Sequence, residues 1–251
     1  MIDTTKTITG VNVNGTSVPL AGGSGGGGGL QDYLDFRMNT TIEQPLYMFF
    51  GGAPDMTLSD LEALAGDLDT SSVTEFAGFF NGDTSLEEVP NWDFTGATDC
   101  NEMFGGCEAL TNVSLNMPDL ESAESMFFGC TSLVTADFSE GGTTLLTYTT
   151  SMFEGCESLT SVLLDGDSIS NAEFMFEGCT SLNYLALTNM AVDFDISAST
   201  EFTASALADI IANLADVSGG DGATLTMGAT NLAKLSQQDI DDASAKGWTL
   251  A

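Results

Sequence analysis

The stretch MFGGCEAL, Met103–Leu110, decides the fold, because the chain repeats its pattern Met-Phe-x-Gly-Cys-x-x-Leu. Three further copies occupy residues 126–133, 152–159 and 175–182. A degenerate copy runs from Phe79 to Leu86, and a weaker one begins at Met48. From Phe79 onward the copies start 24, 23, 26 and 23 residues apart. A period of this length predicts a solenoid, in which each unit buries its apolar face against its neighbours.

The residues that follow each copy predict a short strand. Apolar side chains lie three and five positions after the closing leucine, as Val113 and Leu115 do after Leu110. A spacing of two is that of a strand with one buried face. We therefore expect parallel strands, adjacent in one sheet, at Leu110–Leu115, Leu133–Phe138, Leu159–Leu164 and Leu182–Leu187. The predicted fold class is an α/β repeat solenoid, a stack of short parallel strands joined by helical or turn segments.

Two kinds of segment resemble those of BspA-like leucine-rich repeat proteins. Residues 68–80, LDTSSVTEFAGFF, resemble the LDTSxVTxMxxMF segment of that family. The four Met-Phe-x-Gly-Cys-x-x-Leu copies resemble the segment that follows it, so the resemblance covers about residues 47–190. It implies a leucine-rich-repeat solenoid that serves surface adhesion and protein binding.

The chain divides into four predicted parts. They are an N-terminal attachment hairpin (1–21), a Gly-rich flexible linker (22–29), the solenoid (30–190) and an α/β C-terminal cap (191–251). Asn14-Gly15 between short apolar runs is a strong hairpin signal. The linker consists of seven glycines and one serine, which offer almost nothing that packs. Residues 8–21 also resemble N-terminal attachment segments of gut bacteriophage virion proteins, which implies that residues 1–21 bind other virion proteins.

The cap is predicted to contain two helices and two strands. Four apolar residues lie at the spacing of one helix face: Leu207, Ile210, Ile211 and Leu214. This helix begins near Thr203. Ser236–Asp239 is a capping box that begins the second helix, which ends at Gly247. Residues 223–227 and 248–250 are predicted strands.

The charge balance excludes several classes of function. The chain has 37 acidic residues, four basic residues and no histidine, which gives a net charge of −33. Such a charge repels nucleic acid and anionic membrane surfaces. The absence of histidine excludes Ser-His-Asp and Cys-His catalysis and histidine-ligated metals. The chain shows no secretory signal pattern and no stretch of about 18 apolar residues, so we expect no membrane insertion.

The cysteines and the acidic turns are weak candidates for chemistry. Four of the five cysteines share one repeat position, so we expect a stack of reduced, buried thiols rather than disulfides or a zinc site. Asp165-Gly166-Asp167 and Asp193-Phe194-Asp195 are candidate Ca²⁺ ligands, but neither fits the EF-hand pattern, and solvated turns explain them as well. We expect no cofactor and no metal.

The outward positions of the strands form the candidate binding face. The residues are Glu88, Trp92, Asn112, Ser114, Asn116, Thr135, Asp137, Ser161, Asp165 and Tyr184. Side chains between the apolar positions of a strand point away from the core. Trp92 and Tyr184 stand out, because exposed aromatic side chains often anchor proteins or sugars. The face carries carboxylates and hydroxyls but no base, which favours a cationic protein loop or a glycan.

These patterns predict a non-enzymatic binding protein. The preferred hypothesis is a bacteriophage virion adhesin or decoration protein that presents its solenoid to a host-surface protein or glycan. One alternative is a bacterial surface adhesin exported by an unrecognised route. A second alternative is a polysaccharide-degrading enzyme, which would need two carboxyl groups about 5–10 Å apart beside a cleft. With 37 acidic residues, chance pairs are certain, so the carboxylates alone do not favour an enzyme.

Overall fold

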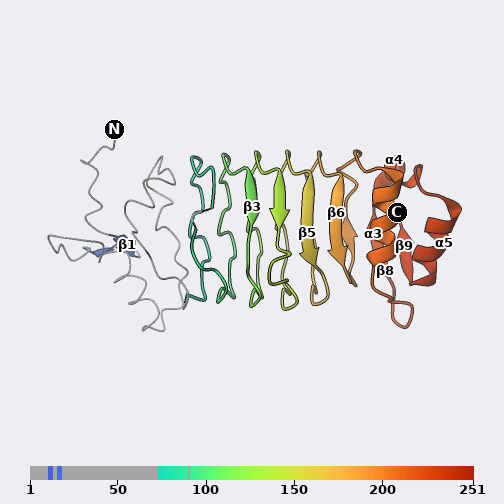
Figure 1. The fold of residues 1–251 in the computed structure, drawn as a ribbon, viewed down its shortest axis with the longest axis horizontal. Helices are drawn as coiled ribbons and strands as arrows, with labels where there is room; N and C mark the ends of the chain where they lie inside the picture. The colour runs from blue at the N-terminus through green and yellow to red at the C-terminus, as the bar shows by residue number, and fades with distance from the viewer. Residues whose placement is uncertain (1–10, 14–15, 19–72, 90) are drawn as a thin grey trace.

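The computed structural model shows a stack of coils closed by a small α/β unit (Figure 1). The structure describes residues 11–13, 16–18, 73–89 and 91–251. Strands β1 (Val11–Val13) and β2 (Thr16–Val18) pair antiparallel, as the Asn-Gly signal predicts. The predicted linker and the first part of the predicted solenoid lie outside the described residues.

The repeats form one parallel sheet, which confirms the strand prediction. Its strands are β3 (Asn112–Ser114), β4 (Thr135–Asp137), β5 (Ser161–Asp165) and β6 (Tyr184–Thr188), in the order β3-β4-β5-β6. Equivalent residues are partners across each pair, so Val113 is paired with Ala136 and Ala136 with Val162. These apolar residues are buried, whereas their neighbours along each strand are exposed or half-buried. The alternation holds each coil in register, because a slip by one residue would turn the apolar side chains outward.

The other segment of each coil, which contains the Met-Phe pair, is built from turns. We call residues 75–83, 99–107, 122–130, 148–156 and 171–179 the turn segments. Single parallel bridges join them from Glu75 to Asp99 and onward to Ser122, Tyr148 and Asn171. The predicted fold class includes helical or turn segments between the strands, and the structure has turns there: no residue within 73–89 and 91–190 is helical. The turns are tight because the fourth residue before each conserved Phe-x-Gly glycine has a positive φ, as Ser125 (55°) and Ser151 (56°) do.

Phenylalanine and cysteine form two internal stacks along the turn segments. The rings of Phe104, Phe127 and Phe153 are fully buried and nearly parallel, with centroids 5.4 Å apart. Phe80 and Phe176 extend this stack at its two ends. Four thiols each donate a hydrogen bond to the carbonyl of the stacked phenylalanine one coil earlier, at 3.1–3.2 Å: Cys107, Cys130, Cys156 and Cys179. All five cysteines are buried, so the predicted stack of buried thiols is confirmed.

The C-terminal unit closes the last coil. Its elements are β7 (Phe194–Asp195), α3 (Ala204–Asn213), β8 (Ala223–Thr226), α4 (Gly228–Leu232), α5 (Gln237–Ala245) and β9 (Trp248–Leu250). The strands pair parallel in the order β7-β8-β9, and α3 packs against β6. Thr203 caps α3 and Ser236 caps α5 with a full capping box, at the positions expected from the sequence. None of the helices in the described part of the chain is long and apolar enough to span a membrane.

Candidate binding surfaces

The predicted binding face contains one continuous row of outward side chains. Parallel pairing places these residues side by side across five coils: Glu88, Asn112, Thr135, Ser161 and Tyr184. All five are exposed or half-buried, and half of the Tyr184 side chain is accessible. We call this set the strand-face row. It is the part of the predicted site that the structure brings together.

The remaining predicted residues lie around this row. Ser114 and Asp137 are partners in the next outward column. Asn116 is exposed just beyond the end of β3. Asp165 ends β5, where its Oδ1 accepts a hydrogen bond from the hydroxyl of Thr188, 3.2 Å away.

Trp92 does not point outward, and the expectation that it does is wrong. Its ring lies 5.5 Å from the rings of both Phe79 and Phe80, and it is half-buried against the core. The first described coil makes only an isolated bridge at Glu88 and no strand. Strand alternation therefore does not govern Trp92, which packs against the phenylalanine rings at the first described coil instead.

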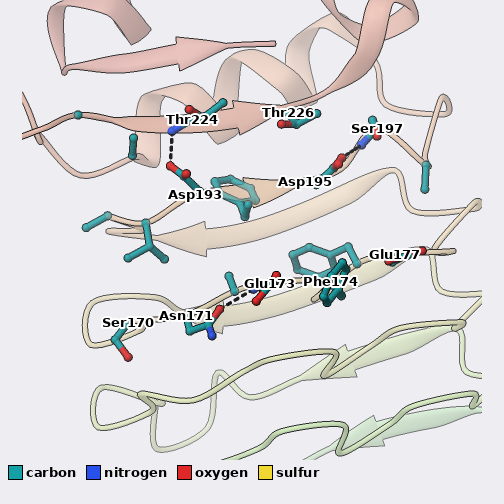
Figure 2. Close-up of a pocket in the computed structure, with 18 residues that line it drawn as sticks. Ser170, Asn171, Glu173, Phe174, Glu177, Asp193, Asp195, Ser197, Thr224 and Thr226 are labelled. Atoms are coloured by element: carbon teal, nitrogen blue, oxygen red, sulfur yellow. Dashed lines mark hydrogen bonds between the residues drawn. The ribbon is translucent and has the colours of Figure 1, made fainter.

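A second surface lies where the last coil meets the C-terminal unit. It is an open pocket of about 1000 Å³ between residues 170–177, 191–198 and 222–226. Figure 2 shows its two walls: Glu173, Phe174 and Glu177 come from the last coil, and Asp193, Asp195 and Thr224 come from the C-terminal unit. The repeat pattern gives no sign of this pocket, because the pocket begins where the repeats end.

Phe174 is unusual within the pocket. Its side chain is 49% exposed, and its φ is +58°. A left-handed backbone conformation is rare for a bulky side chain and costs about 1–2 kcal/mol. Ser125 and Ser151 have the same conformation in earlier coils, so the fold demands the conformation but not the aromatic ring. Phe174 therefore places an exposed aromatic ring where two earlier coils have serine.

The acidic turns make hydrogen bonds to the protein itself. Asp193 accepts from the backbone N–H of Thr224 at 2.6 Å, and Asp195 accepts from that of Ser197 at 2.7 Å. Asp165 accepts from the backbone N–H of Asp167 at 3.1 Å. In the described ranges, no group of three or more His, Cys, Asp or Glu side chains is placed to hold a metal ion.

Neither surface carries a basic side chain, and acidic residues far outnumber basic ones in the solenoid and the C-terminal unit. Residues 73–251 contain 28 acidic residues and two basic ones, Lys234 and Lys246. Both ammonium groups donate to backbone carbonyls within the C-terminal unit, at 2.6–3.2 Å. A cationic or neutral hydrogen-bonding partner therefore fits either surface better than an anionic one does.

The buried thiols offer no reactive group. Burial raises the pKa of Cys130 and of Cys179 to about 12, and it also raises the pKa of Cys107 and Cys156. Because the thiolate is the nucleophile and the metal ligand, these side chains are inert at neutral pH.

Comparison with known proteins agrees with the stacked geometry. The sequence model of the BspA type leucine-rich repeat region matches residues 80–210, in six copies. The chain belongs to this family. No curated protein and no solved structure matches the chain. As a BspA-type leucine-rich repeat protein, it is a repeat protein of the surface and binding class.

Proposed function

We propose that this BspA-type protein is a non-enzymatic adhesion protein of a bacteriophage particle. In this proposal the solenoid binds a protein or glycan on the host surface, and residues 1–21 attach the chain to other particle proteins. The observation that carries the proposal is the strand-face row, which lines up one outward side chain from each of five coils. Solenoids commonly present such rows to their partners.

The chemistry of the row favours a particular kind of partner. It has a carboxylate at one end in Glu88, and an exposed tyrosine at the other end in Tyr184. Between them the hydroxyl of Thr135 donates to Oδ1 of Asn112 at 2.8 Å, which holds two polar side chains in fixed positions. Ordered hydrogen-bonding groups beside an aromatic ring suit a sugar, and the carboxylate suits a cationic protein loop.

Substitution of Tyr184 by alanine tests the row. We expect Tyr184→Ala to weaken binding to host cells, or to its glycan on an array, at least tenfold while the thermal midpoint stays unchanged. Tyr148→Ala is the matched control, because Tyr148 is equally exposed but lies on a turn segment. Equal binding by the two variants and the parent protein would refute the proposed role of the row.

The location of the protein needs a separate test. We expect mass spectrometry of purified phage particles to detect the chain, and deletion of residues 1–21 to remove it from them. Detection on bacterial surfaces in the absence of phage would instead favour a bacterial adhesin. We also expect no release of reducing ends from host glycans, whereas such release would favour the polysaccharide-degrading alternative.

A further inference from the structure

The turn segments are joined by rows of backbone hydrogen bonds that all run in one direction. In each of the first four turn segments, four alternate N–H groups donate to carbonyls of the next coil. In the segment before the last, the donors are Thr149, Ser151, Phe153 and Gly155, and the acceptors are Asn171, Glu173, Met175 and Glu177. The same four bonds recur between every earlier pair of coils, at 2.7–3.3 Å overall. The carbonyls of a coil thus accept hydrogen bonds from the preceding coil, and its N–H groups donate to the following coil.

The last turn segment has no following coil. Its equivalent donors are the N–H groups of Ala172, Phe174, Phe176 and Gly178, and none of them has a carbonyl acceptor within the described residues. Strand β7, which comes next along the chain, pairs with β8 instead. An N–H group without a protein partner is a strong hydrogen-bond donor, and the edge of a ladder is a template for another chain.

Three of these four donors belong to residues that line the pocket at the C-terminal end of the solenoid. Ala172, Phe174 and Phe176 are among the residues that line it, and the opposite wall comes from the segment around β7 and from β8. Figure 2 shows the last coil and the segment around β7 as separate walls with the labelled side chains between them. The pocket therefore lies where the turn segment of one further coil would stack.

We propose that this pocket binds one extended peptide segment of a partner protein, which completes the hydrogen-bond row of the last coil. The repeats define the geometry required: the carbonyls of alternate residues, over about seven residues, accept from the three or four free N–H groups. This is the same principle by which an exposed sheet edge captures a peptide strand. The site is distinct from the strand-face row.

The charge of the pocket selects the partner's side chains. Glu173, Glu177, Asp193 and Asp195 all line it, and no basic residue does. A free anion that could accept from the N–H row would be repelled by these carboxylates, whereas neutral peptide carbonyls would not. Lysine or arginine side chains next to those carbonyls would pair with the carboxylates, and they would also pack on the exposed ring of Phe174. The favoured ligand is therefore a basic peptide.

Nuclear magnetic resonance of the full-length, ¹⁵N-labelled protein tests this proposal directly. The probe is the peptide acetyl-Ala-Lys-Ala-Lys-Ala-Lys-Ala-amide. We expect saturable downfield shifts of the amide protons of Ala172, Phe174 and Phe176, and at least tenfold slower hydrogen exchange at these amides. The amides of Thr149 and Ser151 are internal controls, because they already donate to the next coil and should not shift.

Three comparisons separate this site from general attraction to an acidic protein. Lysine amide, which has no row of carbonyls, should leave the three amides unshifted, and so should the peptide with Glu in place of Lys. Phe174→Ser should weaken peptide binding at least fivefold without unfolding the coil, because Ser151 has the same backbone conformation. Phe128→Ser removes an equally exposed ring outside the pocket and should leave binding unchanged. The proposal would be overturned if the shifted amides lay beside distant acidic residues and none of the three pocket amides shifted. Equal binding of the acidic peptide would also overturn it.

Discussion

The thiol of Cys130 donates a hydrogen bond to the backbone carbonyl of Phe104, with 3.1 Å between Sγ and oxygen. Cys107, one coil earlier, makes the same bond to Phe80 at 3.2 Å. Each thiol therefore links two coils at the position where the phenylalanine rings also stack. The cysteine of the repeat thus has two roles, because it fills a small buried space and satisfies a carbonyl.

Replacement of Cys130 by alanine should destabilise the solenoid by about 1–3 kcal/mol. The variant loses a net hydrogen-bond contribution of about 1 kcal/mol and the packing of a buried sulfur atom. Urea unfolding followed by circular dichroism measures the change. Cys100→Ala is the matched control, because Cys100 is equally buried and its position is occupied by Ala123 and Ala172 in other coils. If both variants lower the free energy of unfolding by the same amount, the hydrogen bond from the thiol to the carbonyl does not contribute to stability.

The buried thiols should also make the protein sensitive to alkaline pH. Burial raises the pKa of Cys130 to about 12 from the ordinary thiol value of 9.0. Between these two values the unfolded chain releases the proton and the folded chain retains it, so the free energy of unfolding falls as pH rises. The stability from this thiol is complete below about pH 9 and decreases above it.

At pH 10 the ionisation of Cys130 alone should lower the free energy of unfolding by about 1.4 kcal/mol. The measurement compares urea midpoints at pH 8 and pH 10 for the parent protein and for Cys130→Ala. The parent should lose about 1.4 kcal/mol more than the variant does over this interval. An identical loss in both proteins would mean that the thiol ionises as readily in the folded state as in the unfolded one.

The solenoid could be predicted because the sequence patterns that specify it are local. Within a coil, the apolar residues three and five positions after Leu110 determine which side of β3 is buried, and the same holds after the other closing leucines. The helix after Thr203 and the capping box at Ser236 are also local signals, and both lie where the sequence places them. The orientation of Trp92 was missed because its coil contains no strand, so the alternation rule did not apply there.

The pocket could not be predicted because it depends on where the stacking stops. The repeat pattern of residues 171–179 is intact, and nothing within it says that the next segment pairs elsewhere. The positive φ of Phe174 was also hidden, because this turn position is filled by serine, glutamate or phenylalanine in the later coils rather than by glycine. The pocket arises where the solenoid meets the C-terminal unit, whereas the positive φ belongs to the repeat itself.

Removal of one ring from the phenylalanine stack should be far more costly than removal of an exposed ring. Phe127 is fully buried, and its ring lies nearly parallel to those of Phe104 and Phe153. Phe127→Ala should lower the free energy of unfolding by about 3–5 kcal/mol. Phe128→Ala, which truncates the neighbouring but 47% exposed ring, should stay within about 0.5 kcal/mol of the parent protein. Comparable losses in the two variants would show that the stack does not determine coil stability.

Substitution of Lys246 should loosen the end of α3. Its ammonium group donates to the carbonyls of Ile211, Ala212 and Leu214, at 3.2, 2.6 and 2.9 Å. These carbonyls belong to the last turn and the C-cap of α3, where a positive charge also complements the helix dipole. Lys246→Met keeps most of the apolar stem, so the variant isolates the loss of the charged donor.

We expect Lys246→Met to lower the free energy of unfolding by about 1.5–3 kcal/mol. Hydrogen exchange should accelerate first at the amides of α3, because its C-terminal carbonyls lose their partner. Ser205→Glu is the control for net charge, since it makes the chain more negative by the same amount at the exposed N-terminal end of the same helix. That variant should remain within about 0.5 kcal/mol of the parent protein. If Ser205→Glu lowered the free energy of unfolding as much as Lys246→Met does, the cause would be charge repulsion within this highly acidic chain. The loss of hydrogen bonds to the three carbonyls would then not explain the effect.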